Sequence, residues 1–254
     1  MTLERYRERF ASIGAKLKDA DPLEQADPLE KFDALYWSLR RAPEVGLAMA
    51  SQEHQRLKAT WDKPILAEIG LDRLTGDQRG QSQWEQFDSM LQSFHRLRFA
   101  MESVVRYLHA SGDLLAQLVN SCGLLSQPLG EEECRLSRVK TLLRKAEKYP
   151  GLDSSLQAFS DSAQFKYVAD ACNRMKHREL MPIRLMYGRD YDPYGNRGKQ
   201  IATACFDAFP HIDKHDKRNH EQVDLDSLEK MAADLLRLGE QVVKEIVAAS
   251  QTPI

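Results

Sequence analysis

Apolar residues recur every three or four positions along most of this chain, which is the spacing of one face of an α-helix. In residues 2–19 the repeat is carried by Leu3, Tyr6, Phe10, Ile13 and Leu17. The pattern predicts an all-α protein built as a helical bundle. Comparable stretches run over residues 84–125, 131–148, 162–180 and 225–249, with Gly112 as an expected kink or break in the longest.

A repeated phrase near the N-terminus marks helix starts. Within DPLEQADPLEKF, each copy places Asp at the N-cap, Pro at the first helical position and Glu at the third. The second copy predicts a helix that starts after Asp27 and ends before Pro43, and another helix follows over residues 44–61. Three glycines within residues 70–82 then predict a loop.

Residues 182–222 interrupt the helical pattern. Two strand-like runs, IRLMYGRD and IATACFDAF, flank a turn rich in Pro, Gly and Asn, so a small β-hairpin is expected near residues 183–209. The polar sequence HIDKHDKRNHEQ that follows predicts a loop. We therefore expect an N-terminal helical region over residues 1–75 and a bundle over residues 83–250 that contains this insertion.

The composition says more about the cellular environment of the protein than about its function. The 254 residues carry a formal net charge of -2, so no global field attracts nucleic acid or anionic lipid. No apolar run reaches the ~20 residues of a membrane span, and the charged N-terminus has no signal-peptide core. The four cysteines are far apart and predict buried free thiols. A cytoplasmic protein without membrane association is expected.

Polar residues form a stripe along the longest predicted helix. His109, Asp113, Gln117 and Asn120 follow one another at steps of four, four and three, which places them on one helical face. Leucines and valines surround them, and buried polar groups need partners. A functional stripe and the solvated face of an amphipathic helix explain the pattern equally well.

A second constellation lies in YVADACNRMKHRELM, residues 167–181. Neighbouring cations favour a neutral His177, the form that a general base requires. The alternative is a helix-end histidine beside ordinary surface cations, and the pattern alone favours it. The expected helix places three polar residues on one edge and three cations beside them: Asp170, Asn173 and His177, then Arg174, Lys176 and Arg178.

Two further groups of charged residues have simpler explanations. The loop after the hairpin contains His211, His215 and His220, but their spacing matches no metal site and nearby lysines oppose a cation. We expect no metal and no cofactor. A basic edge suits phosphate binding, although neighbouring glutamates favour a solvated helix surface. This edge consists of Arg135, Arg138, Lys145 and Lys148, with Arg144 close by.

The two polar constellations resemble the HEPN superfamily of helical bundles. The similarity lies in YLHASGDLLAQLVN, residues 107–120, and in CNRMKHRE, residues 172–179. Together with the last predicted helix it extends from Trp84 to Ser250, and it leaves the N-terminal helices unexplained.

Active HEPN ribonucleases use an arginine, a polar residue and, several residues later, a histidine, usually paired across a homodimer, and they cut RNA without metal. On this chain the polar position is Asn173 and the last is His177, while the arginine position falls on Cys172. The resemblance implies a homodimer that acts on RNA or a nucleotide. It assigns catalysis to His177, Asn173 and Arg174, and substrate binding to Lys176, Arg178, His109, Asp113 and Asn120.

Three functions are consistent with these patterns, and the sequence leaves enzymatic activity open. The first is a metal-independent endoribonuclease of a toxin or antiviral defence system. The second is a catalytically inactive HEPN-like module that binds RNA, a nucleotide or a protein partner, and Cys172 at the arginine position favours it. The third is a helical interaction protein whose N-terminal helices form the docking surface.

Overall fold

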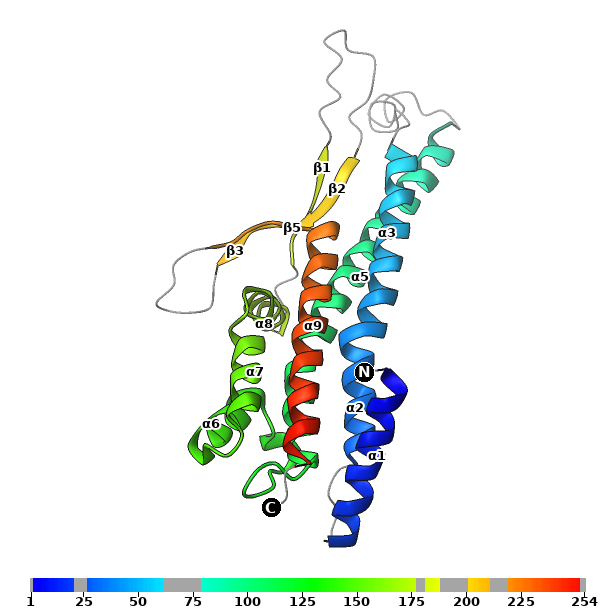
Figure 1. Ribbon diagram of the computed structural model, residues 1–254. Coiled ribbons are helices and arrows are strands. Elements are labelled where there is room, and N and C mark those ends of the chain that lie inside the picture. The colour runs from blue at the N-terminus through cyan, green and yellow to red at the C-terminus, as the bar shows by residue number, and fades with distance from the viewer. Residues whose placement is uncertain are drawn as a thin grey trace. The chain divides into compact units, whose positions relative to one another are not determined.

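The computed structural model of the chain consists of long helices and two short antiparallel sheets (Figure 1). Helices account for most of its residues, so the predicted all-α class with a small β insertion is confirmed. The residues that the structure describes are 2–20, 27–61, 79–176, 181–187, 201–210 and 219–251.

The chain divides into two compact units, and the N-terminal region and the bundle expected from the sequence each contribute to both. Residues 1–43, 105–173 and 230–254 form the first unit, and residues 44–104 and 174–229 form the second. Four of the described helices have residues in both units: α3 (Ala42–Trp61), α5 (Arg79–Ser121), α8 (Ala163–Lys176) and α9 (Leu225–Ala249).

The core of the first unit forms around α9. Gly239 lies against Leu39, because a Cβ at this glycine would be 2.5 Å from Leu39 Cδ1. Gln164 in α8 donates a hydrogen bond to Asp234 at 3.0 Å. The other elements of this unit are α1 (Leu3–Ala20), α2 (Pro28–Tyr36), the π-helix η1 (Trp37–Arg41), the 3₁₀ helix η2 (Glu131–Glu133), α6 (Leu136–Ala146) and α7 (Pro150–Asp161).

Helix α2 begins as predicted but does not end where expected. Asp27 Oδ1 accepts a hydrogen bond from the backbone N–H of Leu29 at 2.9 Å, while the first copy of the phrase lies outside the described residues. The predicted end before Pro43 is wrong, since α2 continues through η1 into α3 (Ala42–Trp61). Proline lacks an N–H and crowds the preceding turn, and the wider π-turn, in which Ala42 N bonds Trp37 O, relieves this.

Helix α5 continues through Gly112, so the expected break at this residue is wrong, while the expected kink stays a prediction. Gly112 instead leaves space for the side chain of Phe165 in α8. A Cβ at this position would lie 2.5 Å from Phe165 Cζ and 3.2 Å from Leu136 Cδ2. A side chain from another helix therefore fills the room that a larger residue would occupy.

Helix α7 has no counterpart among the predicted helices. Pro150 and Gly151 interrupt the apolar pattern, yet the proline takes a position in the first turn, where its missing N–H costs nothing. The buried face of α7 consists of Leu152, Leu156 and Phe159.

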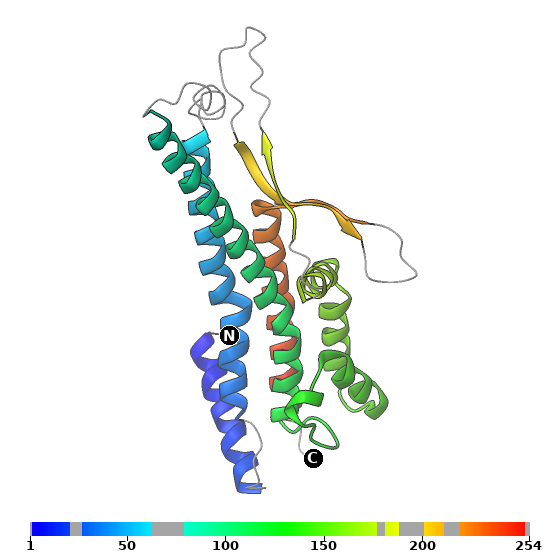
Figure 2. The ribbon, with the colours of Figure 1, turned by 180° about the vertical axis from the view of Figure 1, so that it is seen from behind.

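In the second unit, α3 and the first part of α5 lie side by side and antiparallel (Figure 2). Gly46 faces Val104, and about two turns further along the pair Glu53 lies 4.0 Å from Arg96. Glu53 is buried and also pairs with Arg56 at 2.6 Å. Most of the loop expected between these helices lies outside the described residues, and α5 already begins at Arg79.

The predicted β-hairpin is confirmed. Strand β1 (Ile183–Tyr187) pairs antiparallel with β2 (Ile201–Phe206), which also pairs with β5 (Val223–Asp224). A second small sheet joins β3 (Phe209–Pro210) and β4 (Asn219–His220). The apolar side chains of β2 and β3 contribute Phe206 and Phe209 to the buried residues of this unit.

All four cysteines are buried and free, as the sequence predicts. Burial raises the pKa of Cys122 to about 12, although hydrogen bonds from Ser121 and Ser250 oppose this rise. Burial likewise raises the pKa of Cys134 to about 11. No helix in the described part of the chain has the length and apolarity needed to cross a bilayer.

Candidate nucleic-acid interface

The last turn of α8 carries the described residues of the second polar constellation predicted from the sequence. The buried face of this helix includes Val168 and Cys172, and the next residues around the helix face outward. Asn173 and Arg174 are half-buried, and Lys176 is exposed. His177 and Arg178, the other predicted residues of this site, lie outside the described residues.

The position of the motif arginine faces the protein core. Cys172 is only 4% exposed, and its Sγ lies 4.0 Å from the backbone carbonyl oxygen of Val105 in α5. The Cys172 side chain therefore does not contact a phosphate group on the surface. Of the described residues in this turn, Arg174 and Lys176 supply the positive charge.

Arg174 is held against the small β3–β4 sheet of the second unit. Its guanidinium carbon lies 5.9 Å from the centre of the Phe209 ring, a cation–π distance. The Phe209 ring in turn lies 4.8 Å from the ring of His220. Both rings are buried, so they support the arginine from the protein interior and do not form an exposed surface for stacking.

The stripe on α5 belongs to the first unit, and much of it bonds to the chain itself. Asn120 donates to the Leu129 carbonyl and accepts from the Leu129 N–H, both at 2.9 Å. Asp113 accepts a hydrogen bond from the N–H of Leu136, the first residue of α6, at 3.4 Å. These hydrogen bonds tie the segment that leads from α5 to α6 back onto α5. The predicted substrate contacts of both residues stay a prediction.

His109 is half-buried in the first unit, where its ring lies parallel to that of Phe165. The two ring centres are 6.1 Å apart and the planes differ by 7°. Phe165 also occupies the space above Gly112. This part of the stripe thus packs against an aromatic side chain of α8.

Acidic neighbours reduce the charge of the basic edge on α6. Arg138 pairs with Glu133 at 3.5 Å and Arg144 pairs with Asp153 at 3.7 Å. Arg144 also donates a hydrogen bond to Gln157 Oε1. The exposed cations of the edge outside these pairs are Arg135, Lys145 and Lys148.

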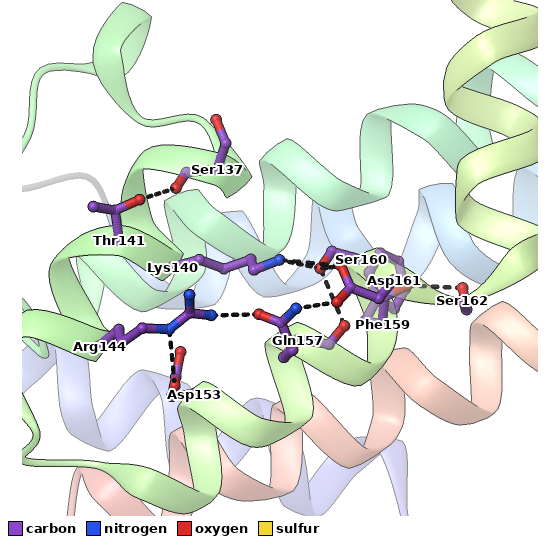
Figure 3. Close-up of polar contacts among 10 residues, drawn as sticks. All are labelled: Ser137, Lys140, Thr141, Arg144, Asp153, Gln157, Phe159, Ser160, Asp161 and Ser162. Atoms are coloured by element: carbon purple, nitrogen blue, oxygen red, sulfur yellow. Dashed lines mark hydrogen bonds and ion pairs between the residues drawn. The ribbon is translucent and has the colours of Figure 1, made fainter. Parts of the chain in front are cut away.

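A polar network that the sequence does not reveal joins α6 to α7 (Figure 3). Lys140 donates to Ser160 Oγ and lies 3.5 Å from Asp161, which also accepts from Gln157. Burial raises the pKa of Asp161, but the hydrogen bond from Gln157, the charge of Lys140 and the Ser160 hydroxyl outweigh it and lower the pKa. The network therefore links α6 to α7 through side-chain hydrogen bonds and an ion pair.

The histidine-rich loop gives no metal site within the described ranges. His220 is buried against Phe209, and His211 and His215 lie outside those ranges. Within the same ranges, no group of three or more His, Cys, Asp or Glu side chains is arranged to hold a metal ion. The ring contact of His220 is with Phe209, the same residue that supports Arg174.

Comparison of the chain with models of known protein families, with curated proteins and with solved structures gave no match.

Proposed function

We propose that this chain is a HEPN-like helical protein that acts on RNA, with the last turn of α8 as its contact surface. The observation that carries the proposal is the position of Arg174, a half-buried arginine that the Phe209 ring supports in the same helical turn as the exposed Lys176. Proteins bind nucleic-acid phosphates chiefly through such arginines and lysines. A guanidinium already held in place loses less side-chain entropy when it binds.

Binding without cleavage is the form of the proposal that the geometry favours. Cys172 occupies the position of the motif arginine and faces the core, so Arg174 is left to stabilise phosphate charge. Cleavage as a metal-independent endoribonuclease of a toxin or defence system is the second form. It assigns the acid–base step to His177, which acts on the attacking 2′-hydroxyl, with Asn173 as its orienting partner.

The binding test compares two lysines on the same helix. Lys176 lies in the proposed surface, whereas Lys166 is an exposed lysine near the start of α8. Titration of labelled single-stranded RNA at several salt concentrations is expected to show weaker binding for Lys176→Glu. The slope of log K against log salt should fall by about one charge, because one phosphate contact is lost. Lys166→Glu should bind like the wild type.

The cleavage test uses total RNA with a chelator present. Loss of cleavage in His177→Ala and Arg174→Ala, with unchanged helical content, would establish the endoribonuclease form. RNA binding without cleavage by the wild type would establish the binding module. A folded wild type that does not bind RNA would overturn the proposal and leave a protein partner as the object of search.

Two further expectations belong to this proposal. We infer a homodimer, because HEPN-like motifs pair across a two-fold axis, and light scattering at high protein concentration tests it. A strict monomer would count against the endoribonuclease form. We also infer a cytoplasmic location, which the four buried free thiols support.

A further inference from the structure

Strand β1 forms one edge of the three-stranded sheet in the second unit (Figure 1). Strand β2 pairs with one side of β1, and no described strand pairs with the other side, which we call the open edge. The backbone N–H and C=O groups along an edge of this kind can pair with a strand of another chain. The open edge of β1 is therefore a candidate contact between molecules.

One hydrogen bond of the hairpin shows which backbone groups of β1 point to the open edge. The N–H of Asp207 donates to the carbonyl oxygen of Pro182 at 2.9 Å, so the backbone of Pro182 points toward the β2 side. Backbone direction alternates along an antiparallel strand, and the residues at odd positions of β1 therefore direct their N–H and C=O groups outward. These residues are Ile183, Leu185 and Tyr187.

Within its five residues, β1 lacks the features that commonly protect an edge strand from pairing. It contains no proline, and its one charged residue is Arg184. The Arg184 Nε lies 3.0 Å from an oxygen of Asp207, the residue that follows β2, so the charge is held toward the β2 side. The hairpin irregularity places its extra residue, Ala202, in β2, and β1 itself stays regular.

The strand is complementary to a second copy of itself in one register. In an antiparallel pair with its two-fold axis at Leu185, the two Leu185 backbones exchange both hydrogen bonds, and Ile183 lies opposite Tyr187. All five residues of each strand are then paired, whereas an axis at any other residue pairs fewer. This register also keeps the two copies of Arg184 apart, because each lies opposite Met186.

We propose that β1 pairs with β1 of a second copy of this chain, antiparallel and centred on Leu185, so that the two sheets become one. Leu185 is half-buried and Met186 is 39% exposed, so both faces of the strand add apolar contacts. Five residues per strand form less than the ~1,600 Å² of a standard interface, and we expect a weak dimer. The inference depends neither on RNA binding nor on contact at the end of α8.

Two substitutions of Met186 test the register. Sedimentation of the full chain between about 10 µM and about 1 mM measures the dissociation constant of the dimer. Met186→Glu places a carboxylate opposite Arg184 of the second copy and should tighten the dimer about twofold to fivefold, while Met186→Arg should weaken it by a similar factor. Gln52→Glu and Gln52→Arg make the same charge changes at an exposed position of α3 and should leave the dimer unchanged.

Disulfide formation tests the distance across the pair. The two Leu185 Cα atoms would lie about 5.5 Å apart, within the range that a disulfide spans. The two Met186 Cα atoms would lie diagonally, about 7–8 Å apart, which is outside that range. Leu185→Cys should therefore cross-link under mild oxidation at least about tenfold faster than Met186→Cys. Wild type gives the background, since its four cysteines are buried and free.

Leu185→Pro removes the central outward N–H, which β2 does not use, and should yield a monomer. Circular dichroism checks its fold, and the Met186 pair decides if this variant does not fold. A wild type that stays monomeric at about 1 mM would overturn the proposal. So would a folded Leu185→Pro that still dimerises, equal dissociation constants for Met186→Glu and Met186→Arg, or equal cross-linking of the two cysteine variants.

Discussion

At the scale of single residues, side chains that look like parts of a binding site can serve the chain itself. Asn120 satisfies both backbone groups of Leu129, and Asp113 caps the first residue of α6. Both residues also satisfy the spacing of a polar stripe. The spacing alone does not distinguish the two roles. It shows on which helical face a residue lies, but not which group that residue contacts.

Replacement of Asn120 by alanine tests its structural role. Asn120→Ala should lower the free energy of unfolding by about 1–3 kcal/mol, because two backbone groups of Leu129 lose their partner. Urea denaturation measures the loss. Gln117→Ala, a half-buried polar residue one turn earlier in α5, is the matched control and should cost less. If RNA binding falls in Asn120→Ala while stability does not, the residue contacts substrate after all.

Gly112 gives a second prediction at the same scale. Alanine forms helices more readily than glycine by about 1 kcal/mol, so helix propensity alone favours Gly112→Ala. The added Cβ would nevertheless lie 2.5 Å from Phe165, and such overpacking costs about 1–3 kcal/mol. We expect a net loss of stability in chemical denaturation.

Gly130→Ala is the control for this experiment, because a Cβ there meets nothing within 4 Å and the backbone is extended. This variant should be neutral or slightly stabilising. Stabilisation by Gly112→Ala would show that Phe165 moves aside easily.

At the scale of elements, the antiparallel pair of α3 and α5 buries charged groups that a simple apolar seam would exclude. Glu53 of α3 is buried and pairs with Arg56 at 2.6 Å, and it lies 4.0 Å from Arg96 of α5. His54, the next residue along α3, is half-buried, and its Nε2 has no hydrogen-bond partner in the described ranges. The lowered pKa of such a half-buried histidine makes the stability of the helix pair depend on pH.

His54 gives the clearest prediction of how the stability of the protein depends on pH. Burial, and then the charge of Lys58, lower its pKa, although Asp226 opposes the shift. The unfolded chain takes up the proton first, so stability is complete above the usual histidine pKa near 6.5 and falls as the pH drops below it. Wild type should therefore lose more stability than His54→Gln between pH 7.5 and 5, by a fraction of the ~1.4 kcal/mol that one pKa unit represents.

Denaturation at several pH values measures this difference. His95→Gln, which changes an exposed histidine on α5, should behave like the wild type. Equal pH dependence in wild type and His54→Gln would show that His54 is as easily protonated in the folded protein as in the unfolded chain.

At the scale of the whole molecule, the buried thiols report on both units. Cys122 lies in the first unit and Cys205 in the second, and burial raises the pKa of each. Since the thiolate is the reactive form, the native protein should react with a thiol reagent at pH 8 more slowly than the unfolded chain.

The same reagent tests whether the two units unfold together. Helices α5 and α9 continue without interruption from one unit into the other, so we expect one cooperative transition. Two variants that each keep a single cysteine, Cys122 or Cys205, should become reactive at the same urea concentration. Earlier reaction of Cys205 would show that the second unit opens separately.

The sequence by itself determined the features that depend on neighbours along the chain. Helical periodicity located α1, α5 and α9, and the cap at Asp27 marked the start of α2. Alternation and turn residues located the β1–β2 hairpin. These signals succeed because caps, turns and helical faces are set by interactions within a few residues.

Only the tertiary structure decided how residues distant in sequence meet. It placed Phe165 over Gly112, brought the N–H of Leu136 to Asp113 and set Arg174 on Phe209. It also carried the helix through Pro43 by a π-turn. The three contacts depend on which faces of the elements pack together, and no local pattern specifies a partner that is tens of residues away.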